Sequence, residues 1–275
     1  MEGTLYLVAT PIGNLADISL RALETLRRAD LIACEDTRHS RKLLTHYEIT
    51  GKLVSFHQHN EHERSAELIR ALKAGSDVAL ISDAGTPGIS DPGEGLVSSA
   101  IKAGIRVVAI PGPTAFVSAV IISGLPADSI FFGGFLPSKR SDRRKRLSEA
   151  RDIPATLVFY EAPHRLAASL ADCLAELGPR RAAVVRELTK IHEEALRGTL
   201  SELADKISNA KIKGEIVLVI DRGGKAPARP VQTTLTERVA ELEKSGMERR
   251  AALKTAAKEF GLSRSEAYRR LQLSE

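Results

Sequence analysis

Acidic, basic and imidazole side chains follow several short apolar runs, at the points where buried strands are expected to end. Three groups stand out, and their members are Glu35, Asp36 and Arg38; Glu161, His164 and Arg165; and Arg186, Glu187, Lys190, Glu193 and Glu194. Such side chains can transfer protons during catalysis, but structural clusters of salt bridges have the same composition. A Ser-His-Asp or Cys-His site is recognised by its geometry, so the sequence alone indicates neither.

The segment 57–62 contains three histidines, His57, His59 and His62, and suggests a metal site. A structural zinc ion needs a completed set of ligands. Neither a cysteine pattern nor an H-E-x-x-H motif accompanies these histidines. We therefore expect polar residues at the edge of a cleft and no metal ion.

Residues 78–95 join a buried strand to a loop of small residues and then to a helix. The first four residues are apolar, which is typical of a strand covered on both faces of a parallel sheet. The loop that follows has one large apolar side chain, Ile89. Asp91 can cap a helix that starts at Pro92, with Glu94 at the spacing of a capping box. Because ligands bind beyond the carboxyl ends of such strands, we interpret the segment as a binding loop.

Strands and helices alternate through about residue 112, which predicts a mostly parallel sheet with helices on both faces. Loops rich in glycine and proline follow its strands at Thr10, Ser82 and Ile110. Loops that leave the same edge of a sheet can converge on one ligand. The glycine motifs for a dinucleotide pyrophosphate and for a nucleoside triphosphate are both missing from the sequence.

A second region begins after the helix-breaking residues 123–126. Its strands are expected at 130–135, 155–160, 182–185 and 216–220, with a short edge strand at 193–197. This region has more strands per helix than the first, which predicts that its sheet is mixed. The predicted organisation is a first α/β domain at 1–115, a second at 116–222, a linker rich in proline and glycine at 223–234, and a basic helical unit at 235–275.

The C-terminal unit is expected to contain three short helices, at 235–244, 248–260 and 264–271. The last two meet at Gly261 and resemble a helix-turn-helix, with basic residues on the final helix. The alternative is a small helical bundle that packs on its own protein or on a second subunit.

The net charge of +5 is concentrated in two segments. Residues 138–151 hold seven Lys or Arg against two Asp or Glu, and residues 225–275 hold eleven against seven. The remaining chain is therefore acidic. Basic segments on an acidic body indicate a polyanion partner such as nucleic acid, although solvated helix faces have the same composition.

Several features predict a protein of the cytoplasm. No apolar run approaches the about 20 residues needed to cross a bilayer, and the amino terminus has no pattern of a secretory signal. Cys34 and Cys173 lie in apolar surroundings and are expected to be free thiols in a reducing compartment.

Long motifs in a fixed order run along nearly the whole chain. They are 7–15 (L-V-A-T-P-I-G-N-L), 33–38 (A-C-E-D-T-R), 82–93 (S-D-A-G-T-P-G-I-S-D-P-G), 110–114 (I-P-G-P-T), 123–126 (S-G-L-P), 134–137 (G-F-L-P), 160–165 (Y-E-A-P-H-R), 186–190 (R-E-L-T-K) and 213–215 (K-G-E). In these motifs the sequence closely resembles the ribosomal RNA small subunit methyltransferase I family, within the tetrapyrrole-methylase-like superfamily.

The resemblance implies two α/β domains of the class III, tetrapyrrole-methylase-like type with a cleft between them, usually in a homodimer. It implies that S-adenosylmethionine binds in the cleft and methylates the 2′-hydroxyl of a cytidine ribose in the decoding region of small-subunit (16S) ribosomal RNA. By the same analogy, the donor is expected to contact Pro11, Gly13, Asp83, Ala84, Gly85, Thr86, Pro87, Ser90, Pro111, Gly112, Thr114, Ala115, Tyr160, Gly214 and Glu215.

A ribose hydroxyl barely ionises at neutral pH, so a nearby base would help the transfer. The candidates are Glu35, Asp36, His57, Glu161, His164, Glu187 and Lys190, and the sequence does not rank them. The residues expected to bind ribosomal RNA are Arg38, Lys139, Arg143, Arg144, Lys145, Arg146, Arg264, Arg269 and Arg270.

Two other functions are compatible with parts of the sequence. A superfamily relative could methylate a small tetrapyrrole or a protein side chain, but such acceptors need no basic track. A non-enzymatic nucleic-acid-binding protein could use the C-terminal helices alone, but it would leave the three glycine-rich loops without a role.

Overall fold

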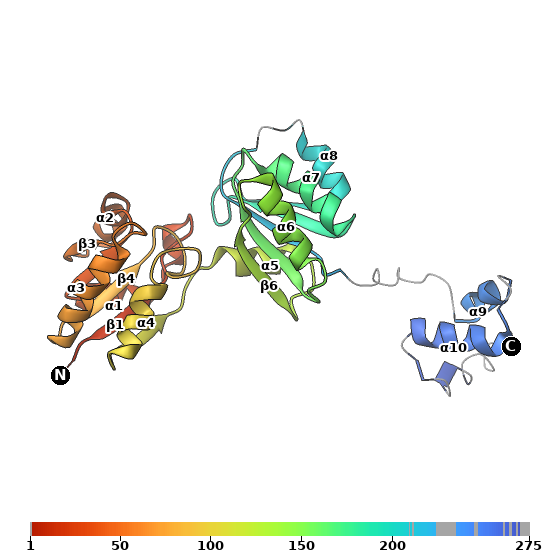
Figure 1. The fold of residues 1–275 in the computed structure, drawn as a ribbon, viewed down its shortest axis with the longest axis horizontal. Coiled ribbons are helices and arrows are strands. Elements are labelled where there is room, and N and C mark those ends of the chain that lie inside the picture. Colours follow the sequence, from red (N-terminus) through yellow and green to blue (C-terminus); the bar gives the residue numbers. More distant parts are fainter. Residues whose placement is uncertain are drawn as a thin grey trace. The chain divides into compact units, whose positions relative to one another are not determined.

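The computed structural model describes residues 2–208, 210, 212–223, 235–244, 247–260, 262–263, 266–267 and 269. The chain divides into two compact units, Met1–Gly223 and Gly224–Glu275 (Figure 1). No helix in this described part of the chain is both long and apolar enough to span a membrane.

The first sheet of the larger unit has five parallel strands in the order β3-β2-β4-β1-β5. Their bounds are β1 Thr4–Val8, β2 Leu31–Cys34, β3 Leu53–Ser55, β4 Val78–Ile81 and β5 Arg106–Ile110. Because all five run the same way, the loops at their carboxyl ends leave one edge of the sheet. The predicted parallel sheet is confirmed.

Helices cover both faces of this sheet (Figure 1). The helices are η1 Leu15–Asp17, α1 Leu20–Arg28, α2 Thr37–His46, α3 Glu61–Lys73 and α4 Glu94–Lys102. Alternate residues of β4 point to opposite faces, as the two-residue period of a strand requires. Val78 and Leu80 pack with α3 and α4, whereas Ala79 and Ile81 pack with α1 and α2.

The second sheet is mixed, with the order β6-β7-β10-β8-β9, as predicted. Its strands are β6 Ile130–Phe135, β7 Thr156–Glu161, β8 Arg181–Arg186, β9 Glu194–Thr199 and β10 Ile216–Ile220. β10 is antiparallel to both β7 and β8, and Ile216 at its start pairs with Glu161 and Arg186 at their ends. One edge of this sheet therefore carries the ends of β7 and β8 and the start of β10.

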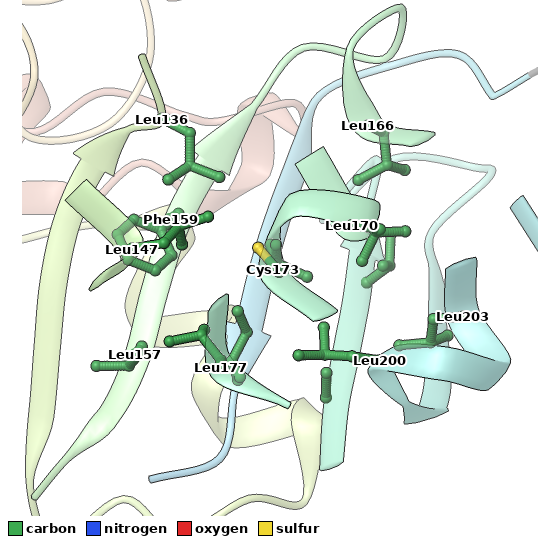
Figure 2. Packing of buried hydrophobic residues seen from close by; sticks show 14 of the residues in the cluster. Leu136, Leu147, Leu157, Phe159, Leu166, Leu170, Cys173, Leu177, Leu200 and Leu203 are labelled. Atoms are coloured by element: carbon green, nitrogen blue, oxygen red, sulfur yellow. The ribbon is translucent and has the colours of Figure 1, made fainter. Parts of the chain in front are cut away.

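One face of the second sheet packs on α5 Ala115–Ser123. The other face packs on α6 Arg140–Ala150, α7 Leu166–Leu177 and α8 Leu200–Ser208. Figure 2 shows the core on that side, where Leu147 of α6 lies beside Phe159 of β7, and where Leu170 and Cys173 of α7 belong to the same buried cluster. Both cysteines of the chain are buried free thiols.

In the smaller unit, α9 Leu235–Lys244 packs on α10 Arg249–Glu259 through an apolar cluster that includes Val239 and Ala256. Both helices match the predicted ones. Most of the third predicted helix, with Arg264 and Arg270, lies outside the described residues, as does most of the predicted linker. The exposed Arg269 is described.

The helix after the small-residue loop begins later than predicted, so the expected cap at Asp91 is wrong. The N-cap of α4 is Gly93, whose φ of 138° suits a residue without a side chain. Glu61 caps the helix instead, because its Oε1 accepts hydrogen bonds from the N–H groups of Gly93 and Gly95, both at 3.2 Å. The side chain of Asp91 therefore does not cap α4 and belongs to the loop between β4 and this helix.

Candidate functional site

A cavity of about 420 Å³ lies in the larger unit, where loops at the strand ends of both sheets meet. The first sheet contributes Ile12, Asp83, Ala84, Gly85, Thr86, Ile89, Ser90, Asp91, Thr114 and Ala115. The second contributes Phe135, Tyr160, Glu161, Ala162, Pro163, Leu188, Gly214, Glu215, Ile216 and Val217. The volume is that of a site for a small molecule or cofactor.

Hydrogen bonds tie the three loops of the first sheet together. Thr10 and Gly85 exchange backbone hydrogen bonds of 2.8 and 3.0 Å, which join the loop after β1 to the loop after β4. The hydroxyl groups of Thr86 and Thr114 lie 2.8 Å apart and join the loop after β4 to the loop after β5. The loops therefore form one continuous wall.

The loop after β4 needs an unusual backbone to follow this path. Gly85 and Gly88 have φ angles of 86° and 80°, which glycine adopts without steric cost. Ser90 has a φ of 62°, a conformation that costs energy for a residue with a side chain. Such costs are often found at functional sites.

Ten of the fifteen predicted donor-binding residues line the cavity. They are Asp83, Ala84, Gly85, Thr86, Ser90, Thr114, Ala115, Tyr160, Gly214 and Glu215. Their contact with a donor stays a prediction, since the cavity defines only where a ligand fits.

The other five, Pro11, Gly13, Pro87, Pro111 and Gly112, are not part of the cavity wall. Gly112 and Gly13 allow close packing behind it. A Cβ on Gly112 would lie 2.9 Å from Cβ of Ala9, and one on Gly13 would lie 2.6 Å from Cγ of Lys190. Pro87 lines a separate shallow pocket beside α4.

The charged side chains of the cavity wall, among the described residues, are all carboxylates. Asp83, Asp91, Glu161 and Glu215 line it, and none of the described lining residues is Lys, Arg or His. Glu161 is buried and already has an ion-pair partner. Its carboxylate lies 2.7 Å from the guanidinium of Arg165 and also accepts hydrogen bonds from the Ser169 hydroxyl and the Ala162 amide. Glu161 is therefore unavailable as a base.

Asp91 is the wall residue with the most perturbed ionisation. Burial raises the pKa of its carboxyl to about 6, and the charges of Glu35 and Asp83 add to the rise, while a hydrogen bond with Ser82 opposes it. Burial and the charge of Asp83 also raise the pKa of Glu35. The sequence did not indicate Asp91 as a candidate base. Its spacing suggested a helix cap, and Glu35, whose charge raises the pKa of Asp91, follows a strand that is distant in sequence.

Asp36 and Arg38 form a local cap rather than part of the cavity. Asp36 caps α2 by accepting a hydrogen bond of 2.8 Å from the Arg38 amide, and it forms an ion pair of 3.1 Å with the Arg38 side chain. This bonding lowers the pKa of the Asp36 carboxyl to about 2. The amide of Asp36 also donates to Asp83 Oδ1 at 3.2 Å, so the start of α2 is joined to the cavity wall.

Glu187 and Lys190 form an ion-paired cluster with Glu215. The ammonium group of Lys190 lies 3.0 Å from Glu187 and 3.1 Å from Glu215. Burial lowers the pKa of Lys190, but these two hydrogen bonds outweigh it and the net shift is upward. The hydrogen bond from Lys190 also lowers the pKa of Glu187. Lys190 therefore stays protonated and holds the wall residue Glu215.

The remaining base candidates are histidines outside the cavity wall. His164 is exposed, and Nδ1 of His57 is buried without a hydrogen-bond partner. The rings of His57 and His59 lie 6.0 Å apart. Among the described residues, no three His, Cys, Asp or Glu side chains could share a metal ion. The expectation that no metal takes part stays a prediction.

The predicted basic surface on α6 is largely neutralised by α7. The prediction that Arg143 binds RNA is wrong, because its guanidinium is buried and pairs with Asp172 at 2.6 Å. Arg144 pairs with Glu176 at 2.6 Å and is half-exposed. Arg146 lies over the ring of Phe131. The exposed Lys139 and Lys145 have no ion pair within the described part of the chain.

A model of the family described as tetrapyrrole (corrin/porphyrin) methylases matches residues 4–204. A ribosomal RNA small subunit methyltransferase I of Mesorhizobium japonicum is 50% identical over 98% of this chain and 92% of its own. The protein of the same name from Halalkalibacterium halodurans is 54% identical over 81% of this chain and 77% of its own.

A solved structure shares the fold at low sequence identity. It is the uroporphyrin-III C-methyltransferase of Thermus thermophilus complexed with S-adenyl homocysteine, with a TM-score of 0.56 and 21% identity. The match covers 80% of this chain and 97% of that one. At this identity the likeness establishes the architecture of two α/β domains and does not establish the acceptor.

Proposed function

Because the chain belongs to the ribosomal RNA small subunit methyltransferase I family of the tetrapyrrole methylases, we propose that it methylates a cytidine ribose of 16S ribosomal RNA. The donor is S-adenosylmethionine, and the acceptor is a 2′-hydroxyl in the decoding region. The observation that carries the proposal is the cavity at the strand ends, with its apolar surface and the carboxylates of Asp83 and Asp91, which form no ion pair within the described residues.

The residues of the cavity fit this donor. S-adenosylmethionine carries a positive sulfonium and a positive ammonium group, and the wall offers the carboxylates of Asp83 and Asp91 with no cation among its described residues. Ile12, Ile89 and Leu188 add apolar surface for the adenosine part. When bound, the donor supplies a methyl group activated for direct displacement by an oxygen nucleophile.

The protein contributes orientation and a proton acceptor. The three tied loops fix the wall, so that a hydroxyl can be held in line with the methyl group, which removes much of the entropic barrier. Asp91 is the side chain that we propose to accept the hydroxyl proton. It lines the cavity, and its raised pKa brings it closer to the operating pH, where a general base is most effective.

Two alternative functions remain to be compared with this proposal. One is methylation of a different acceptor, and the other is nucleic-acid binding without catalysis. Solved structures that share the fold carry names as different as uroporphyrin-III C-methyltransferase and diphthine synthase, so the fold alone does not identify the acceptor. The high identity to ribosomal RNA methyltransferases over nearly the whole chain favours RNA. A non-catalytic nucleic-acid-binding protein would not need the carboxylate-lined cavity.

The test is transfer of tritium from methyl-labelled S-adenosylmethionine to small ribosomal subunits from a strain that lacks the enzyme. We expect the label in RNA, and we expect nucleoside analysis to find it as 2′-O-methylcytidine. Subunits from the parent strain serve as the control and should accept no label. Label in ribosomal protein, label on a nucleobase, or the absence of any label would each refute the proposed acceptor.

The assembly and location of the protein are also proposals. We infer a homodimer in the cytoplasm, in keeping with the family resemblance. The apolar side chains of Val117 and Ile121 lie one turn apart on α5 and are exposed, which supports a covered interface there. Sedimentation of the Ile121→Glu variant should give a smaller species than the parent if this face joins two copies.

A further inference from the structure

Helix α2 carries basic residues without acidic ones. Its sequence, TRHSRKLLTH, holds Arg38, Arg41 and Lys42 and no Asp or Glu. These three side chains and His39 are exposed, whereas Ser40, Leu43 and Leu44 face the core. Residues three and four apart are neighbours on a helix surface, so Arg38, Arg41 and Lys42 form one basic stripe, which we call the α2 stripe.

The α2 stripe is less neutralised than the basic helix α6. Arg38 pairs with Asp36, and within the described residues Arg41 and Lys42 form no ion pair. On α6, by contrast, Arg140, Arg143 and Arg144 are all paired with carboxylates of α7. An unpaired cation gains more from a phosphate group than one that already has a carboxylate partner.

The position of the α2 stripe places it beside the cavity. The helix starts at the carboxyl end of β2, the same edge of the sheet as the cavity loops. The Asp36 amide, which precedes the helix, donates to Asp83 of the cavity wall at 3.2 Å. From Arg38 to Lys42 the helix rises about 6 Å, so the α2 stripe spans a little more than one helical turn.

A further cation lies at the far end of the helix. The guanidinium of Arg27, on α1, donates to the carbonyl of Tyr47, the residue that ends α2, at 3.3 Å. Arg27 is itself exposed. Cations therefore lie at both ends of α2 and between them.

We propose that the α2 stripe binds the phosphate backbone of the RNA strand whose ribose enters the cavity. The inference rests on the proposed function and adds a docking surface to it. Phosphate contacts fix the register of a nucleic acid without reading its sequence. The α2 stripe would thus hold the strand while the cavity selects the ribose.

The test compares two double variants with equal loss of charge. Arg41→Gln/Lys42→Gln removes the unpaired part of the α2 stripe. Arg70→Gln/Lys73→Gln is the matched control, because these exposed residues occupy the last turn of α3 on the opposite face of the sheet. The probe is a fluorescein-labelled single-stranded RNA with the decoding-region sequence, titrated at several salt concentrations.

We expect the α2 variant to bind RNA at least about tenfold more weakly at low salt, because each lost bond is charge-assisted. The slope of log affinity against log salt should fall in magnitude by about 1.4, or about 0.7 for each contact with a single strand. The control should keep the parent's affinity and slope. Both variants should bind S-adenosylmethionine as the parent does, measured by calorimetry.

Equal RNA affinity and slope in the α2 variant and the control would overturn the inference. If the α2 variant loses binding to poly-L-glutamate but not to RNA, the stripe docks an acidic protein and the inference fails. Methyl transfer by the parent separates the two proposals. No transfer to small subunits refutes the proposed function, whereas normal transfer with unchanged RNA affinity in the variant refutes only the docking surface.

Discussion

At the scale of single residues, the ionisation of Asp91 should control the rate. As a base it must be deprotonated, so kcat/KM should rise with pH through about 6, the value to which its surroundings raise its pKa. Asp91→Asn should lower kcat, measured at saturating donor, by about 10²- to 10⁴-fold. Initial rates across pH would check this, and a variant that keeps the parent's rate and profile would exclude Asp91 as the base.

The same carboxyl should also influence stability. Its pKa rises from 3.8 in the unfolded chain to about 6 in the fold, so the folded protein binds the proton more tightly. Stability should therefore fall as pH rises from about 4 to 6, and Asp91→Asn should weaken this fall. Urea denaturation at several pH values measures it.

At the scale of elements, a buried ion pair fixes α6 against α7. Arg143 and Asp172 are 5% and 3% exposed, so Asp172→Asn leaves a buried guanidinium without a counter-charge. We expect a loss of about 3–5 kcal/mol in unfolding free energy. Glu176→Gln is the control, because its partners Arg144 and Arg151 are about half-exposed and such pairs contribute about 0–1 kcal/mol. Equal losses in the two variants would contradict this assignment.

Much of the architecture could be predicted because it depends on local pattern. The apolar run of β4 and the small residues after it predicted a covered strand and a ligand-binding loop at its end. Helix caps can be equally local: Thr199 and Glu202, three residues apart, form a capping box at the start of α8, with reciprocal hydrogen bonds of 2.7 and 3.2 Å.

The errors arose where a partner is distant in sequence. Glu61, from α3, caps α4 and displaces the expected cap at Asp91. Asp172, from α7, buries Arg143, which looked like one of several surface cations. Of the α2 stripe, only Arg38 was predicted to bind RNA, because Glu35 and Asp36 precede the stripe and offset two of its three positive charges in a count along the sequence.

At the scale of the whole molecule, the two units should separate without loss of the donor site. The cavity lies entirely in the unit Met1–Gly223. A chain ending at Gly223 should therefore fold and bind S-adenosylmethionine with the parent's affinity, while binding RNA more weakly and with a flatter salt dependence. Circular dichroism and calorimetry check the first part. Loss of donor binding in a folded truncated chain would show that the C-terminal unit completes the site.

The central claim is that the carboxylate-lined cavity binds the methyl donor, and calorimetry of two glycine variants tests it most directly. Gly85 and Gly88 have similar positive φ angles, so valine strains the backbone similarly at both. Gly85 lines the cavity, whereas a Cβ on Gly88 meets no atom within 4 Å and lies outside the cavity wall. We predict that Gly85→Val abolishes binding of S-adenosylmethionine and that Gly88→Val retains it. Parent-like affinity in a folded Gly85→Val variant would place the donor elsewhere.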